Sequence, residues 1–188
     1  MVDLAEAAAV SLGQVSNVRQ ALLQREWAVA EAAGLRLTAP DSLLDTWRDN
    51  YVPPAGERIS AYTTLHGGKL DDALAAVTKE AGARAALAVF TAARWTAPFV
   101  RGATDTIYCD QAGWDAVRRH IEVGPVQKGA NLEIVVLEDQ GPLLDAVDMP
   151  TGRVVTSPVQ TYLDLWGSGE RGREAAEHLR QETMAWST

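Results

Sequence analysis

The 188 residues include 47% hydrophobic and 22% charged side chains, a balance that suits a globular protein and excludes an intrinsically disordered one. The single cysteine, Cys109, lies in an apolar stretch and is expected in the core; it excludes a disulfide framework or a cysteine-based zinc site within one chain. The net charge of −8 argues against nonspecific coating of nucleic acid but leaves room for a local contact. No signal peptide is visible and the longest apolar run is too short to span a bilayer, so we expect a cytoplasmic protein without membrane contact.

Two short helices and a hairpin are predicted near the start of the chain. Strong helix formers fill residues 3–9, a turn contains Gly13, and a second helical pattern runs over residues 14–26. Alternating residues around Gly34 then predict a two-stranded wing. This order is typical of a winged helix-turn-helix, which normally has one more helix in front. We expect that first helix to be absent, because the chain begins almost directly on the helix at Asp3.

The small core of this unit is expected to come from the apolar positions of the two helices. Without the first helix, part of that apolar surface should be exposed and the unit should be weak by itself. The predicted core residues are Leu4, Ala5, Ala8, Val10, Val15, Val18 and Leu22.

The second helix carries side chains that can read DNA. Residues 11–25 contain two arginines and no acid, so this segment is positive within an acidic chain. Gln, Asn and Arg offer paired donors and acceptors to base edges in a major groove, and Ser11 can cap the helix or contact a phosphate. Arg36 on the predicted wing can contact the DNA backbone. The predicted DNA-binding residues are Ser11, Gln14, Ser16, Asn17, Arg19, Gln20 and Arg36.

A helix over residues 42–50 and a proline-rich linker close the first domain, which we place at residues 1–52. Beyond it strands and helices alternate, so residues 57–188 are predicted to form an α/β domain and the whole chain an α+β fold. Ser157 and Gln160 form a capping box at the start of one of its helices. The predicted strands are 59–65, 85–90, 104–109 and 132–137 with a hairpin near 145–155, and the predicted helices are 69–80, 91–97, 114–121, 159–166 and 170–186.

Four segments carry a family resemblance: residues 47–51, 62–67, 155–165 and 169–176. Together they resemble the AbiEi-type antitoxins and related transcriptional regulators of type IV toxin–antitoxin systems, and the likeness extends over nearly the whole chain. The resemblance implies a winged helix that binds operator DNA and represses its operon. It also implies a second domain with antitoxin activity against a nucleotidyltransferase-like toxin. Because one short helix reads only a few base pairs, we expect a homodimer on DNA.

Catalytic and metal-binding patterns are weak, so we expect no enzymatic activity, no cofactor and no metal. The sequence has no metal-ligand spacing, no phosphate-binding glycine loop and no Gly-x-Ser-x-Gly elbow. His66, just before Gly67 and Gly68, is the best acid–base candidate, although a structural histidine is favoured there.

Two alternatives to the regulator stay open. The first is a protein–protein interaction module whose helix-turn-helix is only a packing unit, which an acidic face on the second helix would favour. The second, less favoured, is an enzyme of the nucleotidyltransferase or nuclease type, which would need a cleft that brings His66 together with two or more carboxylates. The regulator hypothesis itself requires that the polar side chains of residues 14–26 stay uncovered.

Overall fold

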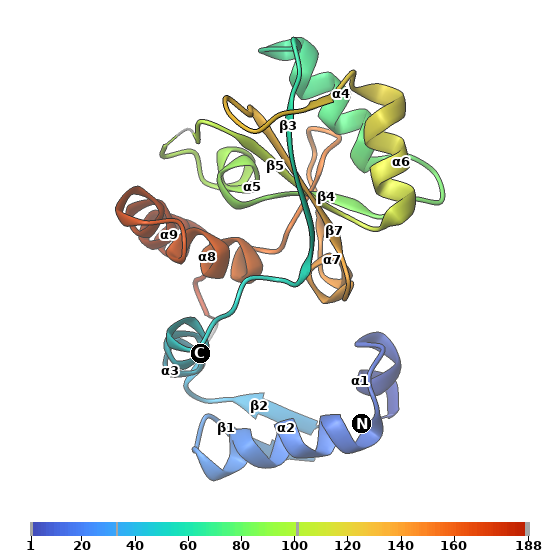
Figure 1. The fold of residues 1–188 in the computed structure, drawn as a ribbon. Coiled ribbons are helices and arrows are strands. Elements are labelled where there is room, and N and C mark those ends of the chain that lie inside the picture. The colour runs from blue at the N-terminus through green and yellow to red at the C-terminus, as the bar shows by residue number, and fades with distance from the viewer. Residues whose placement is uncertain (1, 33, 101, 187–188) are drawn as a thin grey trace. The chain divides into compact units, whose positions relative to one another are not determined.

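A computed structural model describes residues 2–32, 34–100 and 102–186, and the chain divides into two compact units. Unit 1 comprises residues 1–51 together with 186–188, and unit 2 comprises residues 52–185. Figure 1 shows the elements of both units. None of the described helices is long and apolar enough to cross a lipid bilayer.

Unit 1 is built from two helices, a β-hairpin and a third helix. Ser11 starts the second helix, because its side-chain oxygen accepts a hydrogen bond from the backbone N–H of Gln14 at 3.2 Å. This order of elements is the one that the sequence predicts, and the winged helix-turn-helix itself stays a prediction. The elements are α1 (Val2–Ala7), α2 (Leu12–Gln24), β1 (Ala28–Glu31), β2 (Gly34–Leu37) and α3 (Pro40–Asp49).

The core of unit 1 is smaller than the sequence predicts. Ala5 is buried, but Leu4 is 62% and Val18 57% exposed, and Val10 is exposed as well. The prediction that these three side chains form a core is therefore wrong. The physical cause of their exposure is the small size of unit 1: three helices and one hairpin of about 50 residues cannot cover both sides of α1 and α2. Trp47 on α3 is 50% exposed as well.

Unit 2 is organised around a seven-stranded mixed sheet (Figure 1). β7 runs parallel to β5, and β4 runs parallel to β9, whereas the other neighbouring strands are antiparallel. Both edge strands are only two residues long, and β6 pairs with β3 only at Ala61 and Tyr62. In spatial order the strands are β6 (Gly124–Pro125), β3 (Gly56–Tyr62), β7 (Leu132–Leu137), β5 (Asp105–Cys109), β4 (Ala85–Ala88), β9 (Val154–Val155) and β8 (Val147–Asp148).

Helices cover both faces of this sheet. Because side chains alternate along a strand, Ile107 packs into the core beneath α4 and α6, while its neighbour Tyr108 points to the opposite face. On that face α8 and α9 lie against each other, and α5 packs against both. The helices of unit 2 are α4 (Gly68–Thr78), α5 (Val89–Thr96), α6 (Gln111–His120), α7 (Gly141–Leu144), α8 (Pro158–Trp166) and α9 (Glu170–Thr183).

The predicted α+β fold class is confirmed, and β7 has the bounds that the sequence predicts. The capping box at the start of α8 is confirmed in part, since Ser157 Oγ accepts from the backbone N–H of Gln160 at 3.2 Å. The strand predicted over residues 85–90 ends two residues early. Val89 adopts φ 53° and turns the chain directly into α5. The short elements β6 and α7 were not predicted.

Candidate nucleic-acid interface

The outer surface of α2 is uncovered along its whole length. No residue of this fully described helix is buried, and all five of its predicted base-reading residues are exposed. With about 100° between successive residues, Ser16, Asn17 and Gln20 lie on the side opposite the half-buried Val15 and Leu22. The condition that the regulator hypothesis sets on these side chains is therefore met within unit 1.

The charge on α2 also suits DNA better than it suits a basic protein partner. All of its residues are described, and none of them is acidic, while Arg19 contributes one positive charge. Arg25 caps the C-terminal end and places its guanidinium 4.9 Å from the centre of the Trp27 ring. The acidic face that would favour a pure interaction module is not present on this helix.

Two of the predicted DNA contacts are already engaged within unit 1. The hydroxyl of Ser11 accepts the capping hydrogen bond, which leaves only its proton for a phosphate oxygen. On the hairpin, Arg36 Nε lies 2.6 Å from Glu31 Oε1, and both side chains are exposed. A phosphate would have to compete with Glu31 for this guanidinium, so Arg36 is a weaker candidate than the residues of α2.

Unit 2 contains the cleft that the enzyme hypothesis requires, but its carboxylates are occupied. A cavity of about 200 Å³ is lined by His66, Asp71, Asp105 and Arg94. Arg94 Nη2 lies 2.8 Å from Asp71 and 3.3 Å from Asp105, so one guanidinium forms ion pairs with both carboxylates. The described part of the chain holds no group of three or more side chains that could bind a metal ion. This cleft is therefore best described as an ion-pair network that joins α4, α5 and β5.

His66 and Cys109 behave as structural residues. His66 Nδ1 lies 3.1 Å from the carbonyl oxygen of Thr64, which holds the ring locally. Cys109 is fully buried in β5, and this burial, helped by the charge of Asp110, raises the pKa of its thiol to about 12. A thiol with such a pKa is protonated at neutral pH and does not act as a nucleophile. The burial of Cys109 confirms the core position that the sequence predicts.

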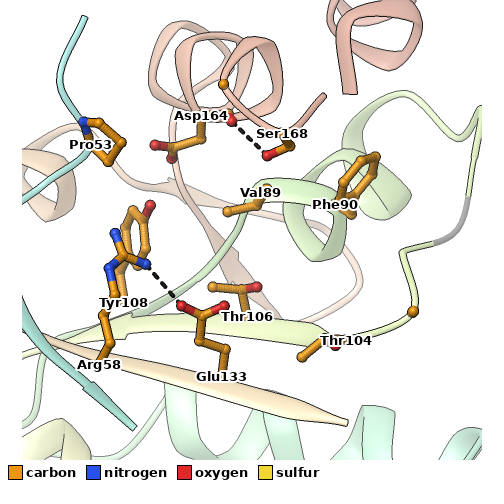
Figure 2. Close-up of a pocket in the computed structure, with 12 residues that line it drawn as sticks. Pro53, Arg58, Val89, Phe90, Thr104, Thr106, Tyr108, Glu133, Asp164 and Ser168 are labelled. Atoms are coloured by element: carbon orange, nitrogen blue, oxygen red, sulfur yellow. Dashed lines mark hydrogen bonds and ion pairs between the residues drawn. The ribbon is translucent and has the colours of Figure 1, made fainter. Parts of the chain in front are cut away.

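A larger pocket, of about 330 Å³ and lined by both charged and apolar residues, was not predicted from the sequence (Figure 2). Its floor is the sheet face that carries Arg58 on β3 and Glu133 on β7, and its roof includes Asp164 on α8. The partners Arg58 and Glu133 are 75 positions apart in the sequence, so no local pattern reveals their pairing. Asp164 could have been noticed in the sequence, because it is the one charged residue in the buried segment 161–165.

A comparison with family models places the chain. A model described as "Transcriptional regulator, AbiEi antitoxin, Type IV TA system" matches residues 36–185. The chain belongs to this family of transcriptional regulators and antitoxins, which is not an enzyme family. No curated protein and no solved structure gives a significant match. α1 and α2 precede the matched residues, so the case for α2 as a DNA-binding helix rests on its own side chains.

Proposed function

We propose that this protein is an autoregulator that binds operator DNA through α2 and serves as the antitoxin of a type IV toxin–antitoxin system. One observation carries the DNA half of the proposal. Ser16, Asn17 and Gln20 present amide and hydroxyl groups to solvent from a helix that carries no acid. Gln14 and Arg19 extend this surface along the edges of the same helix.

The proposed mode of binding places α2 in the major groove. Its amides pair with base edges, while Arg19 and the hydroxyl proton of Ser11 contact phosphates. A single helix covers only a few base pairs, so two copies of the chain would bind half-sites about 34 Å apart, one turn of the DNA. Operator binding of this kind represses the operon by occupying its promoter.

Titration of a labelled promoter fragment with the full-length protein tests the DNA half. We expect binding that weakens as salt rises, because each phosphate contact releases counterions. Asn17→Ala and Gln20→Ala should each weaken specific binding by about tenfold to a hundredfold, the loss expected for a base contact. Gln181→Ala, the same kind of change on the exposed surface of α9, is the matched control and should bind as the parent does. If no salt-sensitive complex forms with the promoter fragment, the DNA half of the proposal is wrong.

The antitoxin half concerns a nucleotidyltransferase-like toxin, whose effect the protein opposes. The family match supports it, because residues 36–185 include all of unit 2. Co-expression with a nucleotidyltransferase-like toxin encoded in the adjacent gene tests it in cells. We expect the full-length protein to restore growth, and the double variant N17A/Q20A to restore it equally well while failing to bind the promoter. Failure of the parent protein to restore growth would refute the antitoxin half alone.

A further inference from the structure

One edge of the sheet in unit 2 is open along part of β3. This strand has seven residues, but β6 pairs with it only at Ala61 and Tyr62. The carbonyl oxygen of Ala61 points to the β7 side, where it accepts from the backbone N–H of Asn131 at 3.1 Å. The carbonyl oxygen of Ser60 points to the other side, where it accepts from the backbone N–H of Val126 at 3.1 Å. Along the preceding residues of β3, no strand of the described chain pairs on this second side.

Two residues of β3 present unpaired backbone groups at the open edge. Backbone groups alternate sides along a strand, so those of Gly56 and Arg58 point the same way as those of Ser60, away from β7. Within the part of the chain that the structure describes, the N–H and C=O groups of Gly56 and Arg58 have no backbone partner. Two donors and two acceptors on alternate residues are the template with which an added β-strand pairs.

An apolar pocket lies beside this edge, on the face of the sheet that α6 covers. It has a volume of about 390 Å³, and its walls include Ile59 of β3 and Trp114 of α6, both partly buried. The guanidinium of Arg118 lies 5.4 Å from the centre of the Trp114 ring and helps to hold it. The remaining lining consists of Ala61, Ile121, Glu122 and Val123. A strand added along β3 would turn every second side chain toward this face.

Glu57 determines the charge next to the pocket. It lies two residues from Ile59, on the same face of β3, and its side chain is exposed. The ion pairs of the described residues do not include it. Opposite charges at facing positions of neighbouring strands stabilise their pairing. A strand that carries a cation two residues from an apolar side chain therefore matches Glu57 and Ile59 together.

A second copy of β3 fits this edge poorly. The antiparallel register that pairs Gly56 with Arg58 of another copy places the two Glu57 side chains directly opposite each other. A shift by two residues places two Arg58 side chains opposite each other instead. Like charges at facing positions are destabilising, so the charges of β3 favour a strand of different sequence.

We propose that the open edge of β3 binds an extended segment of another protein, which adds to the sheet next to Gly56 and Arg58 and runs antiparallel to β3, as β6 does. An apolar side chain of the segment occupies the pocket beside Ile59, and a lysine or arginine two residues later pairs with Glu57. Backbone hydrogen bonds supply affinity, and these two side chains supply selectivity. The surface lies in unit 2 and includes none of the proposed DNA-binding residues, so it goes beyond the proposed function.

Labelled peptides test the backbone pairing with the full-length protein, by fluorescence anisotropy. The parent probe is acetyl-Leu-Thr-Lys-Thr-Ser-Gly, which begins at its leucine because Val126 occupies the position next to Ser60. With this leucine opposite Ile59, the N–H of the first threonine faces Arg58, whereas the N–H of the lysine points away. N-methylation of that threonine should weaken binding about tenfold, because it removes a donor and adds bulk at the edge. N-methylation of the lysine is the matched control and should leave binding unchanged.

Side-chain changes test the pocket and the charge. A probe with serine in place of leucine should bind about tenfold more weakly, because it leaves the apolar pocket empty. A probe with glutamate in place of lysine should bind about threefold to tenfold more weakly, because its charge repels Glu57. Glu57→Lys should reverse this charge preference. Glu177→Lys, at an exposed position on α9, is the matched control and should keep the preference of the parent protein.

Three results would overturn the proposal. Equal binding of the two N-methylated probes would mean that no strand forms along β3. A charge preference that Glu57→Lys leaves as it is would place the binding elsewhere. Protection of the Arg58 amide from hydrogen exchange in the free protein, rising with protein concentration, would show that a second copy covers the edge.

Discussion

Ala9 holds the turn between α1 and α2 in a left-handed conformation, with φ 53°, that alanine rarely adopts. A residue other than glycine in this conformation costs about 1–2 kcal/mol, and replacing it with glycine removes that cost. The greater freedom of glycine in the unfolded chain offsets part of this stabilisation. We therefore expect Ala9→Gly to stabilise the α1–α2 pair by about 0.5–1 kcal/mol. Hydrogen exchange of the α2 amides should slow accordingly.

The control for this change lies two residues earlier. Ala7 is an exposed residue of α1, where glycine disfavours the helix by about 1 kcal/mol. Ala7→Gly should therefore speed hydrogen exchange in the same amides. If both glycine variants shift the exchange in the same direction, the left-handed turn is not what limits the stability of this pair.

Because of Cys109, the free energy of unfolding should depend on pH in the alkaline range. In the unfolded chain its thiol ionises near its ordinary pKa of 9.0, whereas in the folded chain the pKa is about 12. Between these values the unfolded state loses its proton first, so the free energy of unfolding falls as pH rises, by at most about 1.4 kcal/mol per pH unit. Urea denaturation between pH 9 and 10.5 should show a shallower pH dependence for Cys109→Ala than for the parent. The folded parent should also resist thiol reagents at pH 8 and react fully in denaturant.

Residue positions follow from the sequence where they depend on a local pattern. The exposure of Asn17 and Gln20 follows from the helical spacing of polar and apolar residues, which sequence alone reveals. The exposure of Val18 does not, because an apolar side chain becomes core only if another element covers it. The pairing of Arg58 with Glu133 depends on the register of β3 against β7, which no local pattern specifies.

Among the elements, α8 and α9 depend on one glycine for their close packing. A Cβ added to Gly172 would lie 2.2 Å from the carbonyl oxygen of Leu165 and 2.8 Å from Ser168 Cβ. We expect Gly172→Ala to push the helices apart and to lower the free energy of unfolding by about 1–3 kcal/mol, the usual cost of overpacking. Thermal denaturation followed by circular dichroism measures this loss.

Gly68→Ala is the matched control at the level of elements. Gly68 begins α4, and a Cβ placed there meets no atom within 4 Å. Because alanine favours the helix, this variant should be as stable as the parent or slightly more stable. Equal losses at both positions would mean that the contact between α8 and α9 is not responsible.

The limits of the predicted elements have particular causes. β7 was predicted with its observed bounds because its apolar residues, interrupted only by Glu133, end before Glu138. The strand before α5 was predicted too long, since Val89 and Phe90 continue its apolar pattern although the backbone has already turned. β6 has two residues and exists only through its pairing with β3, which sequence periodicity cannot show.

The whole molecule adds information that no element contains. The order of the seven strands combines parallel and antiparallel neighbours and joins segments far apart in the chain, such as β3 with β7. This order brings Arg58, Glu133 and Asp164 to one pocket, and it explains why the sequence predicted the α+β class but not the pocket. The family resemblance, by contrast, could be recognised in the sequence because it depends on short local segments, and the family match confirms it.

The two units should also differ in stability. Among the described residues of unit 1 only Ala5, Ala28 and Leu44 are buried, whereas unit 2 buries several large side chains completely, including Tyr108 and Leu74. Because burial of apolar surface is the main stabilising contribution, we expect unit 1 to open at a lower urea concentration than unit 2. Hydrogen exchange with mass spectrometry across a urea series should show amides of α2 and β1 losing protection first, while β5 and β7 keep theirs. Operator DNA that binds α2 should raise the urea concentration at which unit 1 opens and leave that of unit 2 unchanged. If both units lose protection at the same urea concentration, with and without DNA, they unfold as one.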